Sequence, residues 1–407
     1  MHPTQLQIKD FTYELPPEKI ANYPLQNRDE SKLLVYDKNN ITTTNFKNLV
    51  DYLPENCTLI FNNTKVIQAR LHFFTSANQA IEVFCLEPDD TYKDVSAAML
   101  ATNNVRYKCL VGNLKKWKDE SLVLIKNEIN LTLTIVKKTN EYVLIDFVWV
   151  NTISSPSGDL CFAEVLDKIG ILPIPPYIKR DSEALDTIRY QTVYATHKGS
   201  VAAPTAGLHF TDTVFKSLKT KNIKCLNITL HVGAGTFKPV KTETIGEHTM
   251  HAEWIDVDIT TIKHLSLNQQ VIAVGTTSLR TIETLYWMGV KASINKNASL
   301  LDIEIKQWDA YELISNLSVT ESLSHLMDWL KANNLQSLVC KTQILIAPPY
   351  KFKIVKAIIT NFHQPQSTLL LLISAVVGNN WKTIYNYALQ NNFRFLSYGD
   401  SSLLFTE

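Results

Sequence analysis

The stretch VIAVGTTSLRTIE, residues 271–283, decides the class of fold. It opens with an apolar run that is typical of a buried strand, and a helical pattern begins just after Gly275. We expect a hydroxyl side chain, from Thr276, Thr277 or Ser278, to cap the first turn of that helix. A strand that leads directly into a helix is the repeating unit of an α/β fold.

The start of this predicted helix also suits an anion. Free backbone N–H groups and the positive end of the helix dipole would lie there, at the carboxyl end of a strand. Arg280 falls in the first turn, where the dipole disfavours a cation, so a bound carboxylate or phosphate would explain its presence. An arginine on the surface, without a ligand, is the alternative.

The alternation of strands and helices continues on both sides of this stretch. Strands are predicted at 57–63, 225–232 and 357–362, and helices at 45–53, 161–170, 214–221, 279–289, 322–334 and 369–378. Thr211 should cap the helix at 214–221, and Gly170 should end the helix at 161–170 in a left-handed conformation. We find no internal repeat.

Between about Arg70 and Trp149 the helical period disappears. Six short β-rich runs follow one another there, separated by polar turns: RLHFFT, AIEVFCLE, YKCLVG, SLVLIK, INLTLTIV and EYVLIDFVW. Short strands without helices predict a small antiparallel barrel or sandwich. We therefore expect a mixed α/β main domain, residues 1–66 and 152–407, with a β-barrel domain, residues 67–151, inserted into it.

The composition is that of a folded globular protein with balanced charge. Of the 407 residues, 45% are hydrophobic and 19% are charged, and the net charge is +1, so nucleic-acid binding would need a local basic face. The N-terminus lacks a signal-peptide pattern, the apolar run at 369–377 is too short to cross a bilayer, and the six cysteines include no CxxC pair. We expect a cytoplasmic protein with reduced cysteines, no membrane segment and no metal site.

The segment HVGAGTFKPV, residues 231–240, begins like a dinucleotide-binding motif, but Lys238 occupies the position of its third glycine. Gly233 and Gly235 still predict a tight turn whose backbone can approach a ligand closely. His231 points away from the apolar face of the preceding strand. A solvated strand face is the alternative for this histidine.

The segment EHTMHAEW, residues 247–254, offers His248, His251 and Glu253 as polar candidates. In a strand, His251 and Glu253 share one face and His248 lies on the other, which favours a general-base pair over a metal site. An ordinary polar strand is the alternative.

Two basic clusters could contact a nucleic-acid backbone. Lys179 and Arg180 follow a pair of prolines, and Lys115 and Lys116 precede Trp117. A solvated loop is the alternative for each cluster.

The segment VAAPTAGLHFT, residues 201–211, is too small and bent to build a core. Its polar groups, Thr205 and His209, suit the wall of a pocket. With Ser200 and Asp400 they could suggest a hydrolase triad, but the chain has no G-x-S-x-G elbow, so a hydrolase is disfavoured.

Ten blocks of the chain occur in the order of one known family. They are FTYELPPEKIANYPLQNRDESKLLVYD, FNNTKVIQARL, LPIPPYIKRD, RYQTVYA, GSVAAPTAGLHFT, TLHVGAGTFKPV, HTMHAEW, VIAVGTTSLRTIE, TNFHQPQSTLL and FRFLSYGD. In these blocks the chain strongly resembles the S-adenosylmethionine:tRNA ribosyltransferase-isomerases of queuosine biosynthesis. The resemblance runs from Asp10 to about Phe405 and is weak in the β-rich insert.

The resemblance implies an enzyme that transfers the ribosyl group of S-adenosylmethionine to 7-aminomethyl-7-deazaguanine at the wobble position of tRNA. The sugar is isomerised to an epoxycyclopentanediol, giving epoxyqueuosine, and adenine and methionine are released. S-adenosylmethionine is thus a consumed co-substrate, with no metal, and the partner is a tRNA that carries the deazaguanine precursor. The family fold, an α/β domain with an inserted small β-barrel, agrees with the pattern of the sequence. We expect a monomer or a weak homo-oligomer.

The resemblance also suggests roles for individual residues. The base that removes a proton next to the sulfonium could be His209, His231, or His251 paired with Glu253. Asp400 or His363 could protonate or hydrogen-bond the departing adenine.

The substrate and the tRNA need binding groups as well. The start of the helix at Thr276, Thr277 and Arg280 suits the methionine carboxylate. Further substrate-binding candidates are Thr205, Gly207, Gly233, Gly235, Asn361 and His363, and candidates for contact with tRNA phosphates are Lys179, Arg180, Lys115 and Lys116.

Departures from the family pattern gather in the C-terminal third. Pro349 replaces a glycine, Lys341 and Lys356 occupy positions that are often acidic, Gln364 replaces a leucine, and the region 291–337 is longer than usual. A divergent paralogue is therefore the alternative, either a non-catalytic tRNA- or nucleotide-binding protein or an enzyme with another substrate. An ordinary methyltransferase is disfavoured because its glycine-rich strand–helix start is missing.

Overall fold

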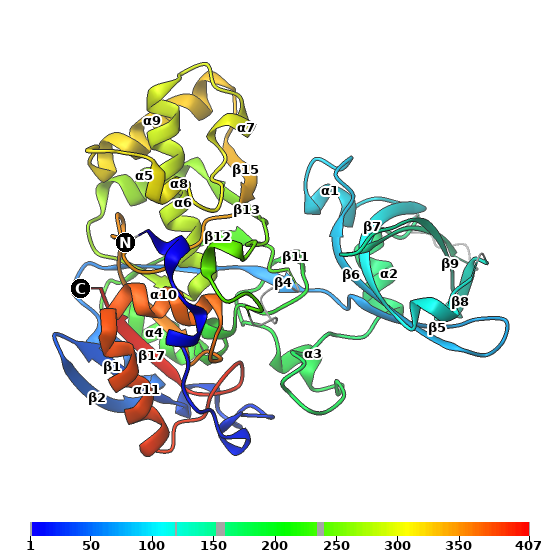
Figure 1. Cartoon of the computed structure of the whole chain (residues 1–407), viewed down its shortest axis with the longest axis horizontal. Helices are drawn as coiled ribbons and strands as arrows, with labels where there is room; N and C mark the ends of the chain where they lie inside the picture. The colour runs from blue at the N-terminus through cyan, green and yellow to red at the C-terminus, as the bar shows by residue number, and fades with distance from the viewer. Residues whose placement is uncertain (1, 119, 152–158, 234–239, 407) are drawn as a thin grey trace.

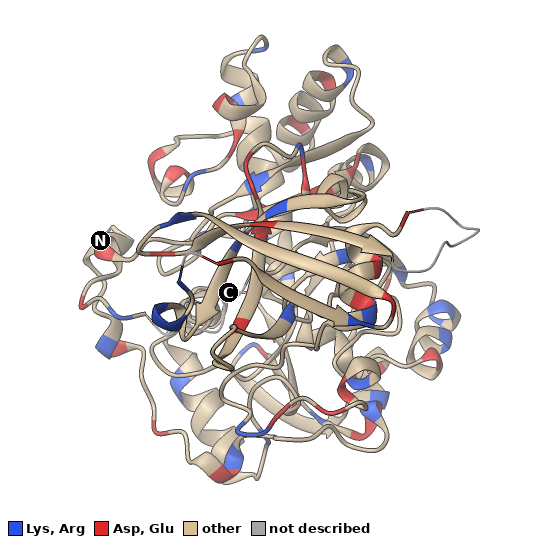
Figure 2. Ribbon diagram, turned by 90° about the vertical axis from the view of Figure 1, so that its right-hand side faces the viewer, with Lys and Arg blue, Asp and Glu red and all other residues tan. Residues whose placement is uncertain are grey.

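The protein is described here by a computed structural model, which covers residues 2–118, 120–151, 159–233 and 240–406. A large α/β unit lies beside a small β unit, and the chain crosses between them near β4 and α3 (Figure 1). No described helix is long and apolar enough to span a membrane. Basic and acidic residues are interspersed over the face seen in Figure 2, as the balanced composition predicts.

A nine-stranded mixed sheet forms the centre of the large unit. Its order is β15 (Ser337–Thr342), β13 (Glu253–Asp258), β12 (Lys224–Leu230), β3 (Thr58–Asn62), β14 (Val271–Val274), β16 (Val355–Asn361), β17 (Ser401–Phe405), β1 (Lys32–Asp37) and β2 (Asn40–Asn45). The four central strands, from β12 to β16, are parallel. The carboxyl ends of these strands therefore meet at one edge of the sheet, where α/β proteins bind ligands.

Apolar side chains alternate between the two faces of this sheet because successive residues of a strand point in opposite directions. In β1, Leu33 and Val35 enter one buried cluster, and Leu34 and Tyr36 enter the other. The larger cluster is covered by α5 (Ile259–Leu267), α6 (Thr276–Ile294), α9 (Val319–Ala332), α10 (Thr368–Val377) and α11 (Trp381–Gln390). The smaller cluster is covered by α4 (Asp212–Thr220) and the 3-10 helix Phe46–Tyr52. The short helices α7 (Leu300–Ile303) and α8 (Asp309–Glu312) follow α6.

The small unit is a nearly closed antiparallel barrel. Its strand order is β5 (Arg70–Phe74), β6 (Ala80–Pro88), β7 (Asn104–Gly112), β10 (Val143–Asn151), β9 (Ile129–Lys138) and β8 (Leu122–Lys126), and β5 lies against β8. The predicted fold class, an α/β protein with a small β-barrel inserted, is confirmed. The helix α1 (Val95–Met99) joins β6 to β7. A separate two-stranded sheet pairs β11 (His197–Ser200) with β4 (Thr64–Val66).

The division into units at residues 67 and 151 stays a prediction. The helix α2 (Phe162–Ile169), which we placed in the main domain, packs its apolar side chains into the core of the barrel. The next helix along the chain is the short α3 (Asp186–Arg189). The lysine at 341, one of the departures from the family pattern, lies 3.3 Å from the Asp90 carboxylate and 5.0 Å from the centre of the Trp254 ring. It therefore links β15 to the loop that follows β6.

Two details of the predicted elements are wrong. The segment 45–53 forms a 3-10 helix rather than an α-helix, although Phe46 and Leu49 are buried as expected. Gly170 ends α2 with φ −79°, outside the left-handed region. Position 170 requires a glycine for another reason, because a Cβ there would overlap the carbonyl oxygen of Gln68. The cap of α4 by Thr211 is confirmed, with the side chain accepting a hydrogen bond from the Val214 N–H at 3.3 Å.

Candidate active site

A cavity, called here the main cavity, lies at the carboxyl ends of β14 and β16. Its empty volume is about 760 Å³, including the open solvent at its mouth. Four segments supply most of its wall: residues 202–206, 275–277, 360–364 and 396–397. Five of the predicted substrate-binding residues line it, namely Thr205, Thr276, Thr277, Asn361 and His363.

The start of α6 faces this cavity without a hydroxyl cap. Gly275 is the N-cap residue, and no described side chain caps the helix, so the predicted cap by Thr276, Thr277 or Ser278 is wrong. Gly275 has φ 89° and ψ 156°, a backbone conformation that side-chain-bearing residues rarely adopt. The first residues of this 19-residue helix line the cavity, and free N–H groups at a helix start are able to bind anions.

Asn361 lines the main cavity and carries an unpaired acceptor. The residue is 3% exposed, and its Oδ1 has no hydrogen-bond partner among the described residues. Its Nδ2 faces both the Asp400 carbonyl, at 3.5 Å, and the His209 Nε2, at 3.2 Å. Because a carbonyl can only accept, the amide nitrogen must be the atom on that side, and Oδ1 is left for a donor on a ligand.

His209 fixes the orientation of this amide. Its Nε2 accepts from Asn361, so the proton is on Nδ1, which lies 2.8 Å from Ser31 Oγ. Burial lowers the pKa of His209 to about 4, and the histidine is neutral at pH 7. The structure places His209 behind the wall of the main cavity, in contact with Asn361.

His363 and Asp400 occupy different places. His363 lines the main cavity, its Nε2 lies 3.0 Å from Thr360 Oγ1, and burial lowers its pKa to about 3. Asp400 is 2% exposed and is not part of the wall. Its carboxylate accepts hydrogen bonds from the backbone N–H groups of Lys32, at 3.1 Å, and Arg394, at 2.8 Å.

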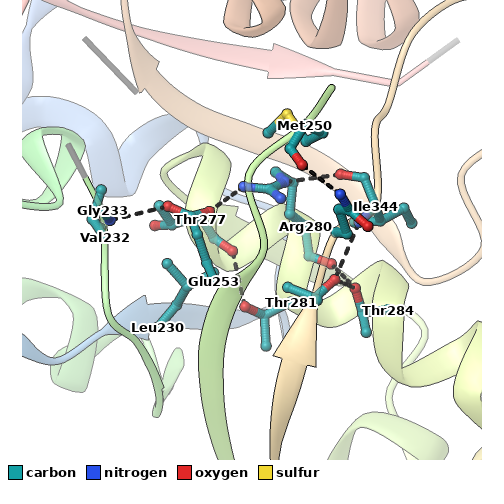
Figure 3. Close-up of polar contacts among 12 residues, drawn as sticks. Leu230, Val232, Gly233, Met250, Glu253, Thr277, Arg280, Thr281, Thr284 and Ile344 are labelled. Carbon is teal, nitrogen blue, oxygen red and sulfur yellow. Dashed lines mark hydrogen bonds and ion pairs between the residues drawn. The ribbon is translucent and has the colours of Figure 1, made fainter. Parts of the chain in front are cut away.

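The predicted pair of His251 and Glu253 is not present. Glu253 is buried at the start of β13, where it binds the Arg280 guanidinium and accepts from the Gly233 N–H at 3.4 Å (Figure 3). His251 is exposed and precedes the strand. Arg280 does not line the main cavity, and its Nε donates to the Ile344 carbonyl at 3.1 Å. The anion beside Arg280 is therefore Glu253, and a ligand for this arginine stays a prediction.

Other predicted site residues lie outside the main cavity. His231 is half-buried, its Nδ1 lies 3.2 Å from Thr64 Oγ1, and burial lowers its pKa to about 4. Gly207 is a glycine for packing, because a Cβ there would overlap the Tyr194 hydroxyl. Gly235 is outside the described residues. No group of three His, Cys, Asp or Glu side chains in the described part of the chain is arranged to hold a metal.

The predicted tRNA contacts are spread over both units. Lys115 and Lys116 are exposed on the barrel after β7, and Lys179 is exposed before α3. Arg180 is bound to Asp186 through two hydrogen bonds, of 2.6 and 2.8 Å, and stacks on Tyr23. Its charge is therefore already neutralised within the protein.

Sequence reasoning missed Ser31, Tyr190 and Ser397, although each lies in a block that supports the family resemblance. Ser31 closes the chain of hydrogen bonds to Asn361, and the other two line the main cavity. These segments come together only in the folded chain. The presence of each residue in one of the family blocks is therefore the sequence signal that could have indicated it.

The family model described as "Queuosine biosynthesis protein" matches residues 8–404. The chain belongs to this family. A protein of Sulfurihydrogenibium sp. (strain YO3AOP1) is 35% identical over 409 residues, covering 98% of this chain and all of that one. A protein of Rickettsia bellii (strain OSU 85-389) is 35% identical over 413 residues, covering 98% of this chain and 99% of that one. Both are named S-adenosylmethionine:tRNA ribosyltransferase-isomerase.

A solved structure is also similar to this queuosine biosynthesis protein. It is the S-adenosylmethionine tRNA ribosyltransferase of Thermotoga maritima, with 25% sequence identity and a TM-score of 0.45. The match covers 97% of this chain and 99% of that one. The family to which the sequence blocks pointed is thus confirmed by the family model and by relatives of full length.

Proposed function

We propose that this chain is an S-adenosylmethionine:tRNA ribosyltransferase-isomerase and that the main cavity binds S-adenosylmethionine as a consumed co-substrate. The ribosyl group would be transferred to 7-aminomethyl-7-deazaguanine at the wobble position of tRNA and isomerised, with release of adenine and methionine. The names of relatives that match 98% of the chain support this activity. The observation that carries the site is the cavity itself, which joins a helix N-terminus to the unpaired acceptor of Asn361.

The two ends of the co-substrate suit the two polar features of the cavity. The methionine carboxylate would bind the first-turn N–H groups of α6, at Thr276 and Thr277. An N–H or O–H group of the adenosine part would donate to Asn361 Oδ1, because a buried acceptor without a partner costs binding energy until a donor meets it. Thr205 lies on the same wall and is able to contact the ribose.

The departing adenine needs a polar partner as well. His363 lines the cavity and is neutral at pH 7, because burial lowers its pKa to about 3. We therefore assign it a hydrogen bond to adenine rather than proton donation. Asp400 is committed to backbone N–H groups, which favours a role in holding residues 394–400 in place.

The proton next to the sulfonium requires a base, and the candidates remain His209, His231 and His251, none of which lines the main cavity. Glu253 is assigned a positioning role instead, because it holds the Gly233 N–H and the Arg280 guanidinium. The proposal also includes a tRNA with the deazaguanine precursor as partner, action in the cytoplasm as a monomer or weak homo-oligomer, and no metal. Activity that survives exhaustive chelation would support the last point.

The test is incubation of the protein with S-adenosylmethionine and tRNA that carries the deazaguanine precursor. We expect free adenine and a modified nucleoside, and neither product with tRNA that lacks the precursor. Binding of the precursor tRNA without adenine release would contradict the proposal and would indicate a non-catalytic relative.

A further inference from the structure

A second hollow adjoins the main cavity at Ser397. It measures about 280 Å³ including its mouth, and three arginines line it: Arg28, Arg189 and Arg394. Ser397 lines both this hollow and the main cavity, and His209 is hydrogen-bonded to Asn361 of the main cavity. We call it the arginine hollow. It is one side chain away from the site proposed for the co-substrate.

Two of its three guanidinium groups are held by carbonyls. Arg28 donates to the Gln191 carbonyl at 2.6 Å and to the Ile188 carbonyl at 2.9 Å, and Arg189 donates to the Gln26 carbonyl at 3.1 Å. Carbonyl oxygens orient a guanidinium but do not neutralise its charge. Among the described residues, no carboxylate lies within ion-pair distance of Arg28 or Arg189. Burial and the neighbouring Arg189 both lower the pKa of Arg28, so the two like charges act on each other.

The third guanidinium group of the hollow, that of Arg394, is paired with a carboxylate. Asp400 accepts from Arg394 Nη2 at 3.2 Å and is otherwise occupied by backbone N–H groups. His209, the other ionisable group that faces the hollow beside Tyr398, is neutral at pH 7, and Tyr398 donates to the Asp186 carboxylate that already binds Arg180. The hollow therefore keeps an excess of positive charge.

We propose that the arginine hollow binds a phosphodiester group of the tRNA backbone, next to the nucleotide that enters the main cavity. Guanidinium groups pair with phosphate through paired N–H donors, and the three arginines converge from separate segments. Ser397 lines both spaces, so a nucleotide that enters the main cavity would have its own phosphate near the hollow. The inference rests on the proposed function.

The carboxylate of S-adenosylmethionine is the other anion available. The start of α6 already offers it backbone N–H groups at the main cavity, whereas the hollow shares only Ser397 with that cavity. This separation favours the phosphodiester.

The test is the salt dependence of tRNA binding by Arg28→Gln and Arg189→Gln. We expect each change to raise the Kd for precursor tRNA about tenfold near physiological salt, and to lower the slope of log Kd against log salt by about one. The affinity for S-adenosylmethionine, measured without tRNA, should stay within about twofold. Arg189→Lys should keep the salt slope because it keeps the charge. Lys331→Gln, an exposed lysine on α9, is the matched control and should behave as wild type.

An unchanged salt slope and Kd in the folded glutamine variants would overturn the inference. So would a loss of S-adenosylmethionine affinity with an unchanged salt slope, which would assign the hollow to the carboxylate. If these variants do not fold, Arg394→Gln gives the same readout, since the backbone N–H of residue 394 still binds Asp400. Failure of the proposed function is distinct, because wild-type protein would then release no adenine even where the salt slopes differ.

Discussion

The Arg280 guanidinium and the Glu253 carboxylate form an ion pair in which each side chain is only 4% exposed. This pair joins the first turns of α6 to the start of β13, and Glu253 also accepts the Gly233 N–H (Figure 3). The start of the helix that faces the main cavity is thereby tied to the backbone of Gly233. The ion pair therefore holds this part of the cavity wall in position.

Removal of one partner should therefore be costly. Glu253→Gln leaves Arg280 buried without a counter-charge, and we expect a loss of about 3–5 kcal/mol in the free energy of unfolding, measured by urea titration. The double variant Glu253→Gln with Arg280→Met should recover part of this loss because no unpaired charge remains. A single variant as stable as the wild type would contradict the buried pair.

Acidification should destabilise the protein through its buried histidines. The pKa of His209 is lowered from 6.5 to about 4, so between these values the unfolded chain binds a proton that the native protein does not. Stability from this group is complete above pH 6.5 and is lost as the pH falls toward 4, by about 1.4 kcal/mol per pH unit. His363, with a pKa of about 3, should act in the same direction.

The measurement is urea unfolding of the wild type and of His209→Gln at several pH values between 4.5 and 7.5. The variant should show a shallower dependence on pH, since glutamine does not titrate. Identical slopes for the two proteins would show that His209 is not held neutral by the fold.

Asn361 should govern the affinity for S-adenosylmethionine. Asn361→Leu removes the unpaired Oδ1 and should raise KM by about ten- to a hundredfold, the equivalent of one buried hydrogen bond of 1.4–3 kcal/mol. His209→Gln, which loses the group that orients the amide, should raise KM less. Steady-state kinetics at saturating tRNA separates KM from kcat, and thermal unfolding controls for misfolding. A change confined to kcat would argue against a binding role.

Three glycines should differ in their tolerance of a methyl group. Gly275→Ala finds space, with its Cβ 3.6 Å from Ala206 Cβ, but the φ of 89° should cost about 1–2 kcal/mol of stability. Gly170→Ala should cost more because its Cβ overlaps the Gln68 carbonyl. Gly233→Ala is the matched control, since no described residue lies within 4 Å of its Cβ, and it should stay within about 0.5 kcal/mol of wild type. Equal effects at all three positions would contradict this ranking.

The identity of the base is decided by kinetics. If one of the candidate histidines removes the proton, its replacement by glutamine should lower kcat about 10²- to 10⁴-fold and leave KM nearly unchanged. His209→Gln, His231→Gln and His251→Gln are compared under single-turnover conditions. If all of these variants keep wild-type kcat, none of these histidines is the base.

Local pattern was sufficient for the α/β alternation and for the barrel, because both depend on periods of apolar residues within one segment. The residue pairs that build the site depend on the order of strands in the sheet, which no single segment contains. From the sequence we expect Arg280 to bind the anion of a ligand. The strand order β13–β12–β3–β14 instead brings Glu253 next to Arg280. The same reason explains why sequence reasoning did not single out Arg28 and Arg189. Arg28 donates to the carbonyl of Ile188, which lies 160 residues further along the chain.

The most direct test of the account is a crystal structure of the protein with a non-reactive analogue of S-adenosylmethionine. The account predicts the analogue in the main cavity, with its carboxylate at the backbone N–H groups of Thr276 and Thr277 and a donor of its adenosine part within hydrogen-bond distance of Asn361 Oδ1. An analogue bound elsewhere, or bound in the main cavity with its carboxylate in the arginine hollow, would contradict the assignment.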